Sequence, residues 1–173
     1  MGFALLTALG AQVRIPLPFT PVPLTLQTFF VLLSGLALGA NLGATAQLVY
    51  LSLGVLGAPF FAGGALGLAY LLGPTGGYLV GFVASAWLVG RLARGIDVWS
   101  GRAPPTMLTI LALGSVVVYL PGVFWLAWLT GKGPWPALLA GVLPFLPGDA
   151  LKTVLAATLW LRLARRSSLG ISA

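Results

Sequence analysis

Asp149 and Lys152 are the residues of this chain best suited to bind a polar group. Asp149 is one of two acidic residues in the chain, and Lys152 follows it by three positions within an apolar run. This spacing places both side chains on one face of a helix, close enough to form an ion pair. A charge at the centre of a bilayer costs roughly 2.5–3.5 kcal/mol on insertion scales, so a charged residue there is expected to have an ion-pair partner or a function. The pair therefore predicts either a polar ligand site inside a membrane protein or an ion pair that only fixes helix packing.

The residues before the pair predict where its helix begins. Proline is tolerated in the first turn of a helix and breaks a helix interior, so Pro147 and Gly148 indicate a helix start. A carboxylate in that first turn, such as Asp149, faces the positive end of the helix dipole. We therefore expect Asp149 and Lys152 at the entry of the last helix.

The composition indicates an integral membrane protein. The 173 residues are 59% hydrophobic and 6% charged, with a mean hydropathy of +1.05, whereas a soluble domain has about 25% charged residues. The net charge is +7, but the positive residues are scattered between apolar runs, which argues against a nucleic-acid surface and for membrane topology signals. We predict a single transmembrane domain over residues 1–173.

The chain lacks the residue sets that catalysis and metal binding need. It has no cysteine and no histidine, which excludes thiolate and imidazole chemistry, and two acidic residues make a metal site very unfavourable. Neither Gly131-Lys132 nor the run that begins at Gly148 has the spacing of a phosphate-binding loop. We therefore expect no enzyme activity, no metal and no cofactor bound by this chain.

The apolar segments predict an all-α integral membrane protein with about six transmembrane helices. They cover residues 1–13, 24–40, 41–55 or 60, 76–92, 106–130 and a last helix from about residue 147. The first is shorter than the roughly 20 residues that a bilayer requires, so residues are missing upstream or the helix extends into the region that follows. Residues 137–145 are also too short to span and predict a re-entrant or interfacial piece.

Two loops of unusual composition connect these segments. Residues 14–23 contain four prolines, which push the backbone into an extended path, and their apolar side chains predict a plug or lid at the membrane surface. Thr25, Gln27 and Thr28 follow, and they either lie beneath that lid or cap the next helix. Residues 58–78 are rich in glycine, and irregular backbone at membrane depth is tolerated only when it is buried in protein or lines a cavity.

The arginines predict the orientation in the membrane. With six spans the termini share one side, together with the loop between the fourth and fifth segments. The positive-inside rule makes that side cytoplasmic, because it carries six of the nine basic residues: Arg91, Arg94, Arg102, Arg162, Arg165 and Arg166. The proline-rich loop, the glycine-rich loop and the Asp149 helix start then lie on the external side, where we expect them to converge.

Two further features allow more than one interpretation. Ala4 and Ala8 either permit close approach of another helix or are ordinary helix residues. Tyr119, Trp125 and Trp128 lie on the later half of the fifth segment. We expect Trp128 to be an interface anchor, whereas Tyr119 and Trp125 are either anchors or walls of a pocket.

Three stretches resemble the BioY family, the biotin-binding S component of energy-coupling-factor (ECF) transporters. The first is Ile15-Pro16-Leu17-Pro18-Phe19-Thr20-Pro21-Val22-Pro23, followed by Thr25-Leu26-Gln27-Thr28. The second combines Phe61-Ala62-Gly63-Gly64 with Leu72-Gly73-Pro74-Thr75-Gly76-Gly77-Tyr78-Leu79, and the third is Phe145-Leu146-Pro147-Gly148-Asp149-Ala150-Leu151-Lys152. The similarity covers almost the whole chain, although family members usually have a longer, basic N-terminal lead.

The resemblance implies a six-helix protein of the prokaryotic cell membrane that binds biotin with high affinity and captures it from outside. It also implies partners in the lipid bilayer and the cytoplasm, namely a transmembrane T component and two ATPase subunits that use the ATP. The family's aspartate and lysine on the last helix, implicated in biotin binding, match Asp149 and Lys152. Its alanines that dock the T component match Ala4 and Ala8.

The chemistry of biotin suits these residues. Biotin has a cyclic urea, an apolar sulfur-containing ring and a carboxylate tail. Asp149 can accept charge-assisted hydrogen bonds from the urea N–H groups, and Lys152 can donate to the urea oxygen or to the carboxylate. Apolar side chains can enclose the ring. The predicted substrate-binding residues are Asp149, Lys152, Tyr78, Gly77, Gly76, Thr25, Gln27 and Phe61.

Two other classes of function are weaker alternatives. In a self-sufficient proton-coupled carrier, Asp149 would take and release protons. An intramembrane enzyme ranks lowest, because one carboxylate and one lysine make a poor catalytic set. Tight binding of biotin without a gradient or ATP would favour a capture protein over both.

Overall fold

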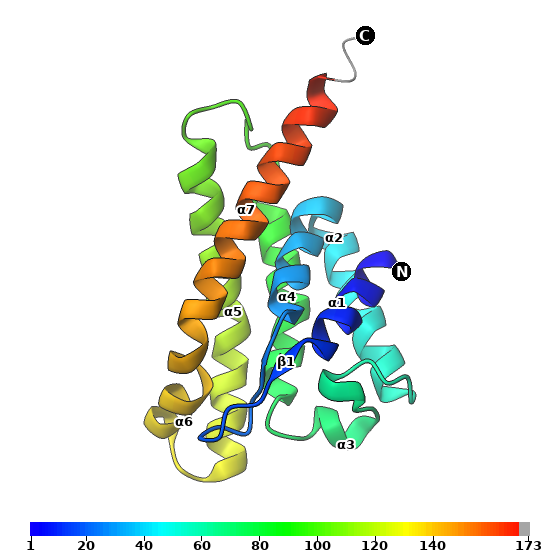
Figure 1. The fold of residues 1–173 in the computed structure, drawn as a ribbon, viewed down its shortest axis with the longest axis vertical. Helices are drawn as coiled ribbons and strands as arrows, with labels where there is room; N and C mark the ends of the chain where they lie inside the picture. Colours follow the sequence, from blue (N-terminus) through cyan, green and yellow to red (C-terminus); the bar gives the residue numbers. More distant parts are fainter. Residues whose placement is uncertain (170–173) are drawn as a thin grey trace.

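The computed structural model describes residues 1–169, in which helices joined by loops make up most of the fold and β1 and β2 form one short hairpin (Figure 1). Residues 170–173 of the predicted single domain lie outside the described residues. The elements are α1 (Gly2–Gln12), β1 (Arg14–Ile15), β2 (Leu24–Thr25), α2 (Gln27–Val55), a 3-10 turn (Ala62–Gly64), α3 (Leu68–Leu71), α4 (Gly76–Leu92), α5 (Ala103–Thr130), α6 (Pro134–Gly141), a second 3-10 turn (Leu143–Phe145) and α7 (Leu146–Leu169).

Three helical stretches of the described residues are long and apolar enough to cross a membrane: Gln27–Val55, Ala103–Thr130 and Pro134–Arg166. Two further apolar helices, α1 and α4, are shorter. The predicted all-α membrane class therefore agrees with the structure in outline, and the short β1–β2 hairpin is an addition to it.

Helix α2 folds back on itself at Gly39. That residue has φ 77° and ψ −179°, a conformation that is almost exclusive to glycine. Gln27 Nε2 donates to Tyr50 Oη at 2.6 Å, and Gln47 Nε2 donates to Ser34 Oγ at 3.0 Å. In a straight helix the first of these pairs would lie about 34 Å apart. The two halves of α2 are therefore antiparallel, and they correspond to the predicted second and third apolar segments.

Helix α4 lies between α2 and α5 and touches both through glycines. A Cβ atom at Gly35 of α2 or at Gly90 of α4 would collide with backbone atoms across the α2–α4 contact. A Cβ atom at Gly77 or Gly81 would collide with the backbone of α5. Small residues let helix backbones approach closely, which drives helix association in a membrane. These contacts fix the position of the α4 N-terminus.

The loops that were predicted to be external gather at one end of the molecule. The β1–β2 hairpin, α3 and α6 lie at the lower end of Figure 1, and the α4–α5 loop and the C-terminal part of α7 lie at the upper end. Arg165 Nε donates to the Val98 carbonyl at 2.8 Å, and the Arg165 guanidinium lies 5.7 Å from the centre of the Trp99 ring. The arginine-rich loop and the last helix therefore meet at the upper end.

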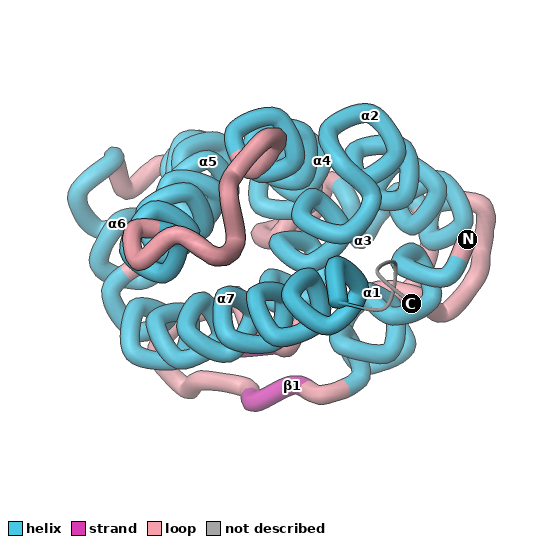
Figure 2. Tube along the Cα trace, turned by 90° about the horizontal axis from the view of Figure 1, so that it is seen from above, coloured by secondary structure: helices cyan, strands magenta, loops and turns pink. Residues whose placement is uncertain are grey.

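Figure 2 shows the bundle from above, with α2, α4 and α5 on one side and α7 with α1 on the other. The proline-rich segment lies outside this bundle. It starts as β1 but turns at residues 18–19, where Thr20 N donates to the Leu17 carbonyl at 3.4 Å, so the expected extended path is interrupted. At its base, Arg14 of β1 pairs with Thr25 of β2 in an antiparallel register. Leu26 N also donates to the Gly10 carbonyl at 3.1 Å. The hairpin is thus tied both to α1 and to the start of α2.

Ala4 and Ala8 lie in the protein's own core. Their side chains are 0% and 7% exposed and lie in the main apolar cluster. Their small size lets α1 pack closely against α2, so the helix that approaches them belongs to this chain itself. Leu5 and Leu9, at 46% and 63% exposed, lie on the open face of α1. A role of the two alanines in docking a partner stays a prediction.

Candidate ligand-binding site

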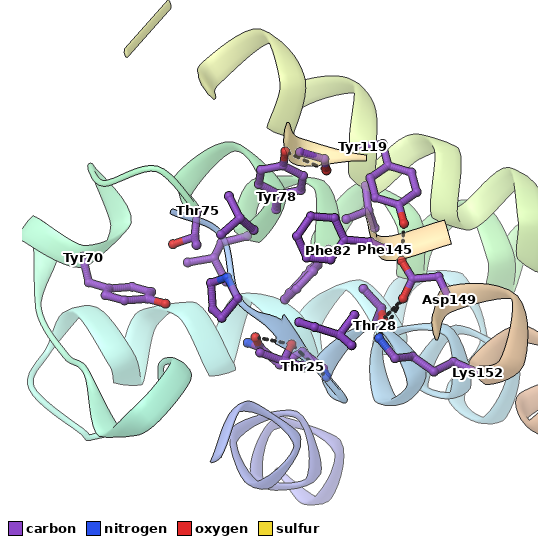
Figure 3. Close-up of a pocket in the computed structure, with 17 residues that line it drawn as sticks. Thr25, Thr28, Tyr70, Thr75, Tyr78, Phe82, Tyr119, Phe145, Asp149 and Lys152 are labelled. Atoms are coloured by element: carbon purple, nitrogen blue, oxygen red, sulfur yellow. Dashed lines mark hydrogen bonds and ion pairs between the residues drawn. The ribbon is translucent and has the colours of Figure 1, made fainter. Parts of the chain in front are cut away.

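A cavity lies at the end of the molecule where the loops gather (Figure 3). The β1–β2 hairpin, the first turns of α2 and α4, the middle of α5, the α6–α7 connection and the first turns of α7 all contribute side chains to it. Segments that are distant in the sequence therefore converge, as expected. The lining residues are Val22, Pro23, Leu24, Thr25, Gln27, Thr28, Tyr70, Thr75, Tyr78, Leu79, Phe82, Val118, Tyr119, Gly141, Phe145, Asp149 and Lys152.

Asp149 is the centre of a polar cluster at one end of this cavity. Lys152 Nζ donates to Asp149 Oδ1 at 2.7 Å, and Thr28 Oγ1 donates to the same oxygen at 3.1 Å. Lys152 Nζ also lies 3.2 Å from Thr28 Oγ1, and the Tyr119 hydroxyl donates to Asp149 Oδ2. Asp149 and Lys152 are 7% and 6% exposed. The predicted ion pair is therefore formed, buried and connected to α2 and α5.

The cluster keeps hydrogen-bonding capacity for a ligand. Each carboxylate oxygen can accept about two hydrogen bonds and an ammonium group has three donors. Oδ1 of Asp149 accepts from Lys152 and Thr28, whereas Oδ2 accepts from Tyr119 alone. Lys152 uses two of its donors, on Asp149 and Thr28. The pair can thus offer one acceptor beside one donor, which complements a ligand edge that carries an N–H beside a carbonyl.

A second polar group ties the hairpin to α2 beneath the proline-rich segment. Thr25 Oγ1 donates to Gln27 Oε1 at 2.9 Å, and Gln27 Nε2 donates to Tyr50 Oη at 2.6 Å. The backbone N–H of Gln27 in turn donates to Thr25 Oγ1 at 3.4 Å. Thr25 therefore contacts the first residue of α2 and also lines the cavity, although the N-cap of α2 is Leu26 and has no side-chain cap.

Aromatic side chains form much of the apolar wall. Phe82 and Phe145 are buried at 4% and 5% exposure and lie between the two ends of the cavity in Figure 3. The Tyr78 hydroxyl donates to the Gly141 carbonyl at 3.0 Å. A Cβ atom at Gly141 would overlap that hydroxyl, so this glycine is required for the contact between α4 and α6.

The structure brings most, but not all, of the predicted binding residues to the cavity. Five of them line it: Asp149, Lys152, Tyr78, Thr25 and Gln27. The other three are not among the lining residues. Gly76 packs against the Leu71 carbonyl, and Gly77 packs against α5. Phe61 is fully buried and stacks on Tyr70 with ring centres 5.0 Å apart.

Other lining residues were absent from the predicted set. Thr75 and Phe145 stand inside the quoted motifs, so the motifs themselves were a signal for them. Tyr119 was left open between anchor and pocket wall, and it lines the cavity. Phe82 follows Tyr78 by four positions, a spacing that places both on one face of α4.

Known proteins resemble this chain along most of its length. The model of the BioY family matches residues 1–168. A protein of Pyrococcus horikoshii named "Probable biotin transporter BioY" is 44% identical over 154 residues, which cover 89% of this chain and 86% of that protein. A protein of Thermotoga maritima named "Biotin transporter BioY" is 39% identical over 163 residues, which cover 94% and 92%.

A solved structure is similar as well. The crystal structure of the S-component for biotin from an ECF-type ABC transporter matches with a TM-score of 0.86 and 27% sequence identity. The match covers 95% of this chain and 87% of that chain. By the family match and by these relatives, the chain belongs to the BioY family.

Proposed function

We propose that this chain binds biotin and is the S component of an ECF-type transporter in a prokaryotic cell membrane. The observation that carries the proposal is the buried Asp149–Lys152 pair, 2.7 Å apart, on the wall of a largely apolar cavity. The names of the relatives, which are biotin transporters, and of the similar structure, an S-component for biotin, support the same ligand.

The ion-pair end of the cavity suits the cyclic urea of biotin. A urea N–H can donate to Asp149 Oδ2, which has one acceptor position left, while the urea carbonyl accepts from the third N–H of Lys152. Hydrogen bonds to charged groups are roughly twice as strong as neutral ones. Phe82 and Phe145 line the adjoining wall and can enclose the apolar ring. A mostly apolar cavity with a few placed polar groups is the usual form of a small-molecule site.

The proposed topology has six membrane spans. They are α1, the two antiparallel halves of α2, α4, α5 and α7, while α6 is a short external piece. The arginine-rich α4–α5 loop and the C-terminal part of α7 lie at the upper end of Figure 1, and the positive-inside rule favours that end as the cytoplasmic one. With six spans, both termini would face the cytoplasm. The cavity then opens toward the outside, from which biotin arrives.

Energy for transport comes, in this proposal, from partner subunits. A transmembrane T component and two cytoplasmic ATPases would complete the transporter, and ATP would be bound by the ATPases. This chain would supply capture and selectivity only.

Binding and transport can be measured separately. We expect purified protein in detergent to bind biotin tightly in isothermal titration, without ATP or a gradient. In proteoliposomes we expect uptake of labelled biotin only when the T component, the ATPases and ATP are present. Lys152→Ala should weaken binding, whereas Lys132→Ala, a lysine in the exposed α5–α6 turn, should not. Absence of biotin binding by the wild type would overturn the proposal, and uptake by this chain alone under a proton gradient would make it a carrier.

A further inference from the structure

We infer that a groove at the opposite end of the molecule from the ligand cavity binds the headgroup of an anionic phospholipid through Arg91 and Arg94. The inference rests on the orientation proposed above, which makes this end cytoplasmic. It does not depend on which ligand the cavity binds.

The groove lies where helix α2 reverses its direction. α4 runs from the ligand cavity, which its first turn lines, to the α4–α5 loop at the upper end of Figure 1. There the end of α4, the Gly39 reversal of α2 and Trp160 of α7 line a groove of about 690 Å³, a volume within the range of small-molecule sites. A Cβ atom at Gly39 would meet no atom within 4 Å, so the groove has free space beside the reversal.

Arg91 and Arg94 give the groove its charge. Both side chains are exposed, and they are the only charged residues that line it. Neither side chain forms a salt bridge or a hydrogen bond within the part of the chain that the structure describes. Asp97, the acidic residue nearest to them in the sequence, accepts a hydrogen bond from the backbone N–H of Trp99 and does not line the groove. Two positive charges therefore line the groove without a carboxylate of the chain to balance them.

The remaining wall of the groove is largely apolar and aromatic. Trp87 precedes Arg91 by four positions, a spacing that places both on one face of α4, and Trp160 lines the groove from α7. Leu38 and Leu42, at 38% and 63% exposed, line it beside the reversal of α2. Tryptophan is enriched at membrane–water interfaces, where its ring lies at the level of the headgroups. The groove therefore combines positive charge with exposed apolar surface at one membrane interface.

An anionic phospholipid matches this combination better than a soluble acidic partner does. A guanidinium group binds a phosphate through two parallel N–H donors, and the acyl chains of the same lipid can pack on the apolar wall. A soluble acidic partner offers the charge without the acyl chains. Basic pockets between transmembrane helices on the cytoplasmic side are typical sites for anionic headgroups, and the cytoplasmic leaflet is negatively charged.

Arg91 also has a possible role that needs no ligand. It lies in the last turn of α4, where a cation stabilises the negative end of the helix dipole. Arg94 lies beyond Ala93, the C-cap residue of that helix. A loss of lipid binding in Arg94→Gln alone therefore separates a ligand site from an effect on the helix.

The test compares phosphatidylglycerol, which is anionic, with phosphatidylcholine, which is zwitterionic. We expect native mass spectrometry of purified wild-type protein in detergent to show phosphatidylglycerol bound at concentrations at which phosphatidylcholine is not. Arg91→Gln with Arg94→Gln should weaken phosphatidylglycerol binding about 10-fold or more, the scale of hydrogen bonds to charged groups. Arg162→Gln with Arg166→Gln removes two exposed arginines of α7 outside the groove. This matched control should bind the lipid as the wild type does.

Several results would overturn the inference. Equal binding of the two lipids by the wild type would exclude a site for an anionic headgroup. Equal losses in the two double variants would mean that net charge, and not the groove, attracts the lipid. Displacement of phosphatidylglycerol by an equal concentration of inorganic phosphate would assign the groove to free phosphate instead.

Biotin titration keeps this test separate from the proposed function. The Arg91 and Arg94 variants should bind biotin as the wild type does, because the groove and the cavity lie at opposite ends. If the double variant does not fold, Arg94→Gln compared with Arg166→Gln gives the same decision, and unchanged phosphatidylglycerol binding in Arg94→Gln would then overturn the inference.

Discussion

The hydroxyl group of Tyr119 on α5 donates a hydrogen bond to the carboxylate of Asp149 on α7. This contact occupies the carboxylate oxygen that Lys152 and Thr28 leave free, so that donors from α2, α5 and α7 together surround one buried charge. A buried carboxylate with several hydrogen bonds is held in one orientation. Tyr119 therefore positions the group that we propose to meet the urea of biotin.

Removal of the Tyr119 hydroxyl should weaken ligand binding. In Tyr119→Phe, Asp149 loses a charge-assisted hydrogen bond, an interaction of about 1.5–3 kcal/mol, and its carboxylate can turn away from the ligand. We expect a drop in biotin affinity of about 10-fold or more in isothermal titration. Tyr78→Phe is the comparison, because it loses only the neutral hydrogen bond to the Gly141 carbonyl. A larger loss in Tyr78→Phe than in Tyr119→Phe would contradict the positioning role.

The ion pair should behave as one unit in binding. Asp149→Asn removes the charge and turns one acceptor into a donor that faces a urea N–H, and we expect a loss of about 2–4 kcal/mol. Lys152→Ala should cost a similar amount, because it leaves Asp149 buried without its counter-charge. The double mutant should lose much less than the sum of the two single mutants.

A purely structural ion pair would give a different pattern. The mutants would then lose thermal stability, while the folded fraction would bind biotin as the wild type does. Isothermal titration of monodisperse protein with biotin separates the two cases. Wild-type affinity for biotin in folded Asp149→Asn would contradict the proposal that Asp149 binds the ligand.

The sequence predicts those parts of the site that depend on local spacing. Asp149 and Lys152 are three residues apart on one helix, so their contact follows from helix geometry. Thr28 and Tyr119 meet Asp149 from 121 and 30 residues away, and no local pattern reports such a contact. The reversal of α2 occurs at Gly39, near the predicted break between the second and third apolar segments. A backbone with positive φ favours glycine, so a glycine at this point was a local signal for the reversal.

Motifs were less informative about what each residue touches. Gly76, Gly77 and Phe61 stand in the stretches that resemble the family, yet the two glycines serve close packing of α4 and Phe61 packs between Tyr50 and Tyr70. A glycine in a motif signals a close approach but does not say whether a ligand or another helix approaches. Only the packing of the whole chain decides that question.

The reversal of α2 should depend on Gly39. Its φ of 77° with ψ near 180° is strained for any residue with a Cβ atom, although no atom lies within 4 Å of the place where that Cβ would stand. Gly39→Ala should therefore lower stability by about 1–3 kcal/mol through backbone strain alone. Gly101→Ala, which also meets open space but has no positive φ, should leave thermal unfolding in detergent unchanged. Equal stability of the two variants would mean that α2 reverses in another way.

The orientation of the chain can be tested with reporter fusions. Six of the nine basic residues map to the end of the molecule proposed to be cytoplasmic, so a reporter fused after Arg102 or after Ala173, which lies outside the described residues, should read as inside. A reporter inserted after Lys132 should read as outside. If either of the first two reads as outside, the six-span topology is wrong.

The burial of Ala4 and Ala8 changes what their substitution should do. Because both side chains lie in the apolar cluster, Ala4→Leu with Ala8→Leu forces bulk into a filled space, which costs typically about 1–3 kcal/mol. We expect a lower temperature of thermal unfolding for this double variant even in the absence of partner subunits. Unchanged stability would mean that α1 does not pack against α2 in the membrane as it does here.

The open face of α1 then becomes the sharper test of partner docking. Leu5→Ala with Leu9→Ala removes two exposed side chains, so stability and biotin binding in detergent should stay close to those of the wild type. If α1 contacts the T component through this face, uptake in proteoliposomes with the complete transporter should fall while binding persists. Leu159→Ala, an exposed leucine of α7 at 41% exposure, controls for a general loss of lipid contact. Normal uptake by the α1 variant would contradict docking through the open face of α1. The T component would then have to contact the buried alanines, Ala4 and Ala8, instead.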